Sequence, residues 1–280
     1  MKVKLTTLCE NTAGKPGFAA EWGLSILIET EKTTVLFDTG KSSAVLENAD
    51  KLGIDLRKID RIVLSHGHGD HTGGIRKVLK RVGKMEVVAH PAIWEKKYTK
   101  RPYETLEAYC GIPFAREELE SLGASFTLTA QPFTLSDRMM TTGEIDMTVD
   151  YETVEPSLLL KKGNMFKPDI FRDDLSIVMK TDEGLVVILG CAHRGTINTI
   201  HHAQKMTGEE RVYAVVGGTH LFPASEERVE RTISELMELD VKKVGISHCN
   251  GFYASMRVAQ ALGRDRFFLN NAGTQVTFPI

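Results

Sequence analysis

The feature that most constrains the fold of this 280-residue chain is a cluster of three histidines and one aspartate within six positions. The cluster comprises His66, His68, Asp70 and His71. Residues 59–64, directly before it, are apolar and β-branched and predict a buried strand. Residues 75–82, directly after it, carry apolar side chains at helical spacing and predict an amphipathic helix. The cluster therefore lies on a strand-to-helix turn, where ligand sites of α/β proteins form.

The spacing within the cluster favours a metal site. His66 and His68 are two residues apart in an extended segment, so both imidazoles can point the same way. The glycines on either side of His68 have no Cβ atom and leave room for ions and water. Asp70 and His71 follow the bend and can face a second ion. Imidazole and carboxylate ligands suit zinc or another borderline transition ion. A purely structural cluster is the alternative, but burying so many polar groups without a partner costs several kcal/mol.

Three later segments repeat this arrangement. The apolar runs 185–189, 212–216 and 241–247 each predict a strand that ends in small residues and a histidine, with a helical pattern after it. These histidines are His193, His220 and His248. Seven of the nine histidines follow predicted strands, whereas His201 and His202 lie on a predicted helix and are expected at the surface. Two mixed sheets packed face to face, with helices outside, would bring these strand ends to one rim.

The first cluster is similar to the H-x-H-x-D-H signature of the metallo-β-lactamase superfamily. Residues 35–40 resemble that superfamily's early strand, which ends in an aspartate, here Asp38, that braces the metal-binding loop. Further segments resemble one subgroup, named for 7,8-dihydropterin-6-yl-methyl-4-(β-D-ribofuranosyl)aminobenzene-5′-phosphate synthase; they are residues 21–25, 142–145, 173–176, 190–193, 217–221 and 247–249. The resemblance implies an α/β fold, a four-layer αββα sandwich of two mixed β-sheets flanked by helices.

The resemblance also implies roles for the site residues. The first ion is expected to bind His66, His68 and His193, and the second ion Asp70, His71 and His248. Asp70 is also expected to orient water for catalysis. His220, on the same rim, is expected to bind substrate or donate a proton, with a structural histidine turned into the sheet as the alternative. His90 is expected to be structural, because Pro91 follows it and no ligand of the superfamily corresponds to it.

The third ligand of the first ion could be Cys191 or His193. Both follow the strand 185–189, and alternation turns both to the same side, so geometry alone does not choose. A third imidazole gives an open three-histidine arrangement that leaves a position for water. A thiolate would make that water less acidic. We therefore expect His193 to be the ligand and Cys191 to be a small buried apolar residue.

The chain departs from the superfamily pattern at two places. Many relatives have a ligating histidine after Thr-Pro-Gly, where this chain has Thr142-Gly143-Glu144. Many have a bridging aspartate after a strand that ends in glycine, where this chain has Gly190-Cys191. Glu144 is expected to bind metal, to support a ligand or to be a surface acid. Without the bridging carboxylate, two alternatives are a weakly bound second ion and a metal other than zinc.

Bulk properties fit one domain spanning residues 1–280, with a partly helical insertion or lid around 92–122 and a loop at 151–174. The 35 lysines and arginines against 37 aspartates and glutamates give a net charge of −2, which argues against nucleic acid as a partner. The four cysteines are widely spaced and suggest reduced thiols. No signal peptide or membrane-spanning run is recognisable, so the cytoplasm is the expected location.

The expected function is that of a metal-dependent hydrolase that acts on a small anionic ester, phosphoester or lactone. One or two divalent ions are expected, with zinc first and iron, manganese or magnesium as alternatives. A transferase that joins a dihydropterin pyrophosphate to an aminobenzoate-like acceptor is the second interpretation. A di-iron redox protein and a non-catalytic metal sensor are less favoured. Lys161, Lys162 and Arg172 give weak support to a phosphorylated substrate.

Overall fold

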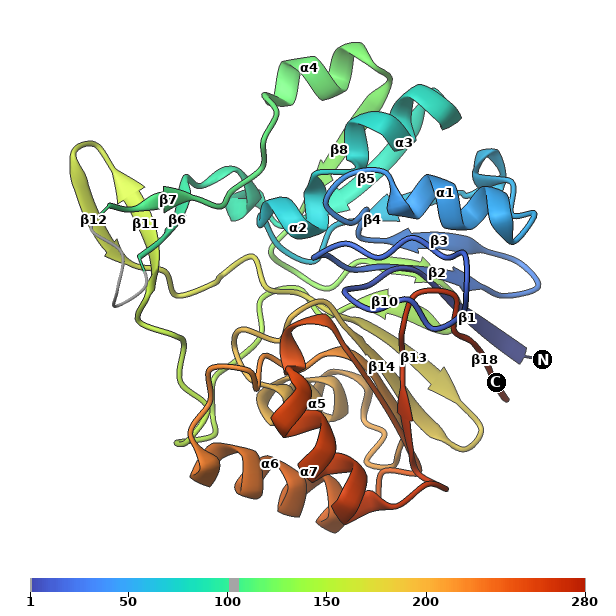
Figure 1. The fold of residues 1–280 in the computed structure, drawn as a ribbon, viewed down its shortest axis with the longest axis vertical. Coiled ribbons are helices and arrows are strands. Elements are labelled where there is room, and N and C mark those ends of the chain that lie inside the picture. Colours follow the sequence, from blue (N-terminus) through green and yellow to red (C-terminus); the bar gives the residue numbers. More distant parts are fainter. Residues whose placement is uncertain (1, 101–105, 280) are drawn as a thin grey trace.

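The structure, a computed structural model, describes residues 2–100 and 106–279. Two seven-stranded sheets form its centre (Figure 1). The first has the order β18-β1-β2-β3-β4-β5-β8, with β1 (Lys2–Cys9), β2 (Ser25–Glu29), β3 (Thr34–Phe37), β4 (Arg61–Val63), β5 (Met85–Ala89), β8 (Ala124–Leu128) and β18 (Gln275–Pro279). The second has the order β17-β16-β15-β14-β13-β10-β9, with β9 (Thr134–Ser136), β10 (Met139–Thr141), β13 (Ile177–Thr181), β14 (Gly184–Leu189), β15 (Val212–Gly218), β16 (Lys243–Ser247) and β17 (Phe267–Leu269).

Both sheets are mixed, and their parallel parts carry the rim expected from the sequence. Strands β3, β4, β5 and β8 run parallel, as do β14 to β17, whereas the remaining pairs are antiparallel. The carboxyl ends of parallel strands meet at one edge of a sheet. The histidine-bearing segments follow β4, β14, β15 and β16, so the topology gathers them at these edges.

Helices cover the outer face of each sheet. α1 (Ala44–Lys51) and α3 (Ile75–Val82) lie over the first sheet, and α5 (Thr196–Thr207), α6 (Glu226–Glu238) and α7 (Phe252–Leu262) lie over the second (Figure 1). Three apolar clusters hold these layers together. One joins the inner faces of the sheets, through Ile26, Phe37 and Val88 on one side and Ile177, Ile188 and Val216 on the other. The other two join each sheet to its helices. The four-layer αββα prediction is confirmed.

A third, four-stranded sheet projects beside the sandwich (Figure 1). It has the order β12-β11-β6-β7, with β6 (Lys97–Thr99), β7 (Ala108–Tyr109), β11 (Leu158–Lys162) and β12 (Met165–Pro168). The segment 92–122 thus contributes two strands, part of the 3-10 turn Pro91–Trp94 and α4 (Arg116–Ser121); residues 101–105 lie outside the described part. The expectation that 151–174 is a loop is wrong for residues 158–168, which form the hairpin β11–β12, with β11 paired to β6.

None of the helices in the described ranges is long and apolar enough to cross a membrane. Two short helical elements begin at the rim itself: α2 (Gly69–Thr72) within the first cluster, and the 3-10 turn His248–Asn250. A further 3-10 turn, Leu56–Lys58, precedes β4.

The start of α5 depends on a buried acid, Glu152, which is 1% exposed. Its carboxylate oxygens accept hydrogen bonds from the backbone N–H groups of Ile197 (2.9 Å) and Asn198 (2.7 Å). Glu152→Ala leaves both donors without this acceptor, and we expect it to lower the free energy of unfolding by about 2 kcal/mol. Urea denaturation measures the change, with Glu238→Ala, at the exposed end of α6, expected within about 0.5 kcal/mol of wild type. Equal stability of the two variants would contradict this role.

Candidate metal centre

The structure brings all six predicted metal ligands together in two neighbouring groups. One group comprises His66, His68 and His193, and the other Asp70, His71 and His248. Within each group the candidate ligand atoms lie within 4.8 Å of one another. The two sheets supply both groups: the 66–71 segment follows β4, whereas His193 and His248 follow β14 and β16. The predicted rim therefore exists as a single side-chain cluster.

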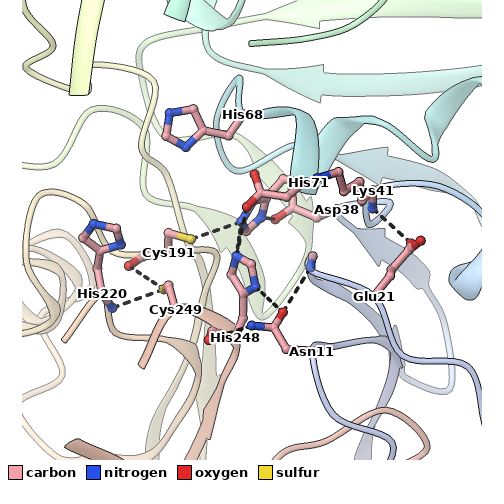
Figure 2. A network of polar contacts seen from close by, with 12 residues as sticks. Asn11, Glu21, Asp38, Lys41, His68, His71, Cys191, His220, His248 and Cys249 are labelled. Atoms are coloured by element: carbon pink, nitrogen blue, oxygen red, sulfur yellow. Dashed lines mark hydrogen bonds and ion pairs between the residues drawn. The ribbon is translucent and has the colours of Figure 1, made fainter. Parts of the chain in front are cut away.

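Hydrogen bonds fix which nitrogen of each second-group histidine carries the proton. Asp38 Oδ2 lies 2.6 Å from His71 Nδ1, so that nitrogen donates. Asn11 Oδ1 accepts from Gly23 N–H and lies 2.8 Å from His248 Nδ1, so that nitrogen donates as well (Figure 2). In the neutral rings both Nε2 lone pairs then face each other across 3.2 Å. Such converging acceptors need a cation or a proton between them.

Negative charge strengthens this preference for a cation. Asp70 Oδ2 lies 3.3 Å from His248 Nε2, and neighbouring histidines hold the pKa of its carboxyl well below the usual value although burial opposes this. For His71, burial by itself lowers the pKa of the ring. The carboxylates of Asp38 and Asp70 outweigh burial and raise this pKa to about 9. The second group therefore offers one ionised carboxylate and two imidazoles to a proton or a metal ion.

The first group presents nitrogen ligands alone. Ser65 Oγ donates to Asp38 Oδ2 at 2.7 Å, so it accepts from His66 Nδ1 at 2.9 Å. The lone pair of His66 thus lies on Nε2, 3.3 Å from Nε2 of His193. His68 Nε2 is buried and has no hydrogen-bond partner. Burial holds the pKa of His66 and His193 well below the usual range and lowers that of His68 to about 3. Three neutral imidazoles with candidate ligand nitrogens within 4.8 Å of one another fit a borderline metal ion such as zinc.

Cys191 lies between His71 and His220 (Figure 2). Its Sγ atom is 3.1 Å from His71 Nε2, and it shares one candidate ligand group with His66 and His71 and another with His193 and His220. Cys191 is buried, which raises the pKa of its thiol. The sequence favoured a small apolar role for this residue. The structure gives it in addition a position within ligand reach of both groups, at the place where many relatives have the bridging aspartate.

The backbone is strained around this cluster. Within the described ranges six non-glycine residues have positive φ, and five of them are at or beside the site: Asp38, Phe171, Ala192, His220 and His248. Such conformations cost about 1–3 kcal/mol each and persist only where the surroundings impose them. Strain concentrated here indicates that the surroundings hold these side chains in their orientations.

His220 lies at the edge of the first group. Its ring centroid is 4.2 Å from that of His193, and its Nε2 is 3.2 Å from a carboxylate oxygen of Glu155. Its backbone N–H donates to Cys249 Sγ at 3.2 Å (Figure 2). Most of its side chain is buried. His220 therefore lies beside the three-histidine group with its Nε2 paired to Glu155, and its role in substrate binding or proton transfer stays a prediction.

Other residues singled out from the sequence lie outside the ligand groups. Glu144 is half-exposed, pairs with Arg194 (3.2 Å) and lines a cavity of about 490 Å³ together with Thr142 and Lys205. His90 has the expected structural role, since its Nδ1 accepts from Ala92 N–H at 3.0 Å. The expectation that the helical pair His201 and His202 is at the surface is wrong for His202, whose side chain is mostly buried and whose Nε2 donates to Thr142 O at 3.2 Å, whereas His201 is partly exposed.

The three basic residues that suggested a phosphate site belong to the projecting sheet or the loop after it. Lys161 Nζ lies over the rings of Tyr98 and Phe166, and Lys162 pairs with Glu95 at 3.4 Å. Arg172 is exposed. These three residues give no further support to a phosphorylated substrate.

Sequence reasoning missed the residues that support His248 from the N-terminal segment. Glu10 Oε1 accepts from His248 N–H at 2.7 Å, and Asn11 Nδ2 donates to His248 O at 3.1 Å. These contacts join positions more than 230 residues apart, and no local pattern marks them. The Glu21–Ser25 segment was recognised only by resemblance. Its Glu21 accepts from the backbone N–H groups of Lys41 and Ser42 and so fixes the loop after Asp38.

Comparison with known proteins agrees with this geometry. Residues 23–202 match the metallo-beta-lactamase superfamily, and the chain belongs to this superfamily. It is 34% identical to the 7,8-dihydropterin-6-methyl-4-(beta-D-ribofuranosyl)-aminobenzene-5'-phosphate synthase of Methanocaldococcus jannaschii, over 99% of this chain and 97% of that protein. It is also similar to Tm1679, described as a metal-dependent hydrolase of the beta-lactamase superfamily, with 28% identity, a TM-score of 0.86, and coverage of 99% of this chain and 100% of that one.

More distant structures share the fold alone. Zn(2+)-bound PqqB from Methylobacterium extorquens has a TM-score of 0.57 and 10% identity, over 98% of this chain and 99% of that one.

The choice between His193 and Cys191 can be tested by paired substitution. His193→Ala removes one of three nitrogens that face a common point, and we expect it to weaken zinc binding by about tenfold or more. Cys191→Ser keeps the volume of the side chain, and we expect the smaller effect. Competition with a chromophoric chelator measures both. If Cys191→Ser weakens zinc binding by about tenfold and His193→Ala leaves it unchanged, the assignment is reversed.

Proposed function

We propose that the chain is a metal-dependent hydrolase that acts on a small anionic ester, phosphoester or lactone with one or two divalent ions, zinc first. The observation that carries this proposal is the group of His66, His68 and His193 beside the Asp70 group, with the candidate ligand atoms of each group within 4.8 Å of one another. Sites with three protein ligands and an open position are typical of catalytic rather than structural zinc. An ion held there supplies a Lewis acid and lowers the pKa of water at the site towards about 7.

The chain's own residues would hold and move the protons. Asp70 has an ionised carboxylate at the rim, where it can accept a hydrogen bond from water and orient it. His220 stands beside the first group with Glu155 at its Nε2, and it is the candidate proton donor to the leaving group. Asp38 keeps His71 in one tautomer and one orientation. Iron, manganese or magnesium are the alternative ions.

A transferase is the second candidate, and one observation favours it. The relative from Methanocaldococcus jannaschii, similar over almost the full length of both chains, is named as a synthase of a dihydropterin compound. In this interpretation an aminobenzoate-like acceptor replaces water, and the cationic site stabilises a pyrophosphate leaving group of a dihydropterin. The description of Tm1679 as a metal-dependent hydrolase supports the first candidate.

A substrate panel separates the two. Metal-loaded protein is assayed with phosphodiesters, lactones and carboxylic esters, and separately with a dihydropterin pyrophosphate with and without an aminobenzoate-like acceptor. We expect metal-dependent hydrolysis of at least one ester or lactone, and Asp70→Ala to lower it by about 10²-fold with the fold retained. Asp146→Ala, an exposed aspartate paired with Lys205, is the matched control and is expected within about threefold of wild type.

Two results would overturn parts of this proposal. Pyrophosphate release that depends on the acceptor would replace the hydrolase by the transferase. Activity of Asp70→Ala within about threefold of wild type on a good substrate would remove Asp70 from the mechanism.

A further inference from the structure

Phe171 is in contact with all three histidines of the first group. Its ring stacks on that of His193, with centroids 3.9 Å apart and an interplanar angle of 14°. The ring of His68 meets it edge-on at 5.3 Å, and that of His66 lies at 6.3 Å. Phe171 is fully buried and has a φ of 51°, which is unfavourable for a bulky residue. Something must therefore hold this ring against the histidines.

The other face of the Phe171 ring carries a buried cation. Lys97 Nζ lies over the ring, 4.5 Å from its centroid. Because the His193 ring occupies one face at 3.9 Å, the ammonium group lies over the opposite face. Lys97 is 1% exposed and belongs to β6 of the projecting sheet. The imidazole, the phenyl ring and the ammonium group thus form a stack, which a cation–π interaction favours when the cation is desolvated.

Lys97 also connects the ring to the ligand loop through two buried carboxylates. Its Nζ is 2.6 Å from Asp169 Oδ2 and 2.8 Å from Asp173 Oδ1. The other oxygen of Asp169 accepts from Phe171 N–H at 2.7 Å, and that of Asp173 accepts from Gly67 N–H at 2.8 Å. One ammonium group therefore fixes the backbone of Phe171 and the backbone between His66 and His68.

The space at Gly67 shows how closely this unit fits. A Cβ atom there would lie 2.3 Å from Ile93 O and 3.2 Å from Lys97 Cε. The sequence suggested that the glycines of the cluster leave room for ions and water. At Gly67 that room is taken by Ile93 and Lys97, and at Gly69, where a Cβ would lie 3.1 Å from Gly111 O, by Gly111. The projecting sheet is thus packed directly on the ligand loop.

We propose that Lys97 and Phe171 are positioning residues for the three-histidine group, through which the projecting sheet sets the affinity and geometry of that group for a divalent ion. The inference rests on the metal centre of the proposed function. Neither side chain is a ligand. Phe171 orients the ring of His193, and Lys97 holds Phe171, Asp169 and Asp173 in place.

Charge and positioning predict opposite effects of removing the ammonium group. Lys97→Met keeps the length of the side chain and removes one positive charge. Loss of the Coulomb repulsion between this charge and a nearby cation would by itself tighten the binding of the cation. Loss of the support for Asp173 and Phe171 would weaken the binding of the cation. Substitution of residues that support metal ligands typically lowers metal affinity by about 10–100-fold. We infer that positioning dominates. Phe171→Leu changes no charge and tests the ring alone.

The experiment measures zinc affinity by chelator competition, and the visible spectrum of the cobalt-substituted protein, in a His248→Ala background that removes one ligand of the second group and leaves the first group intact. We expect Lys97→Met and Phe171→Leu each to weaken zinc binding by about tenfold and to alter the cobalt spectrum. Lys161→Met is the matched control, because Lys161 also lies over aromatic rings of the projecting sheet but away from the ligand groups. It should leave both measurements unchanged.

Breaking a buried ion pair also lowers stability, so a second control is needed. Leu236→Ala removes a buried side chain of α6 and is expected to lower stability to a comparable extent, and it should leave the zinc affinity unchanged. If Lys97→Met does not fold, Phe171→Leu and Lys97→Met/Asp169→Asn, which removes one charge of each sign, replace it.

Unchanged or tighter binding in these variants would overturn the positioning role and leave the metal centre standing. A wild-type protein that binds none of zinc, iron, manganese and magnesium would overturn the proposed function itself.

Discussion

The site depends first on the carboxylate of Asp38. This side chain is fully buried and accepts hydrogen bonds from Ser65 N–H, from Ser65 Oγ and from His71 Nδ1, all at 2.6–2.7 Å. Through Ser65 it sets the tautomer of His66, and it sets that of His71 directly. One acid thus orients a ligand in each group. A buried carboxylate is costly unless it is well paired. Here its hydrogen-bond donors are Ser65 of the ligand loop and His71, a candidate metal ligand.

The two candidate reactions make the same demand on this centre and differ in what attacks. Both need a cationic site that stabilises developing negative charge, because hydrolysis and pyrophosphate displacement each release an anion. The placement of Cys191 bears on both, since a thiol within reach of His66 and His71 can change the charge and softness of the site. The positioning unit of Lys97 and Phe171 serves either reaction. The nature of the acceptor therefore depends on residues that bind substrate rather than on the ligand groups.

Much of this could be predicted from local sequence. The 66–71 cluster, the strand before it and the helix at 75–82 appear as expected, because short-range periodicity and turn chemistry determine them. The three later strand ends were found by the same signal. The αββα sandwich followed from alternation of strands and helices together with resemblance.

The rest depends on contacts between distant segments. Lys97 stands in a run of basic residues typical of an exposed surface, yet Asp169 and Asp173, more than 70 positions away, make its burial possible. The sequence of the hairpin β11–β12 predicted a loop because the segment is short and rich in charge. Pairing of β11 with β6 stabilises the hairpin. The second role of Cys191 was hidden because its nearest ligand partner, His71, is 120 positions away.

The most direct test of the central claim is anomalous diffraction at the zinc edge from crystals of the zinc-reconstituted protein. We expect an anomalous peak about 2.0–2.1 Å from nitrogens of His66, His68 and His193, with any second peak beside Asp70, His71 and His248. Crystals of fully reconstituted protein with no peak between the three histidines, or with zinc bound only elsewhere, would contradict it.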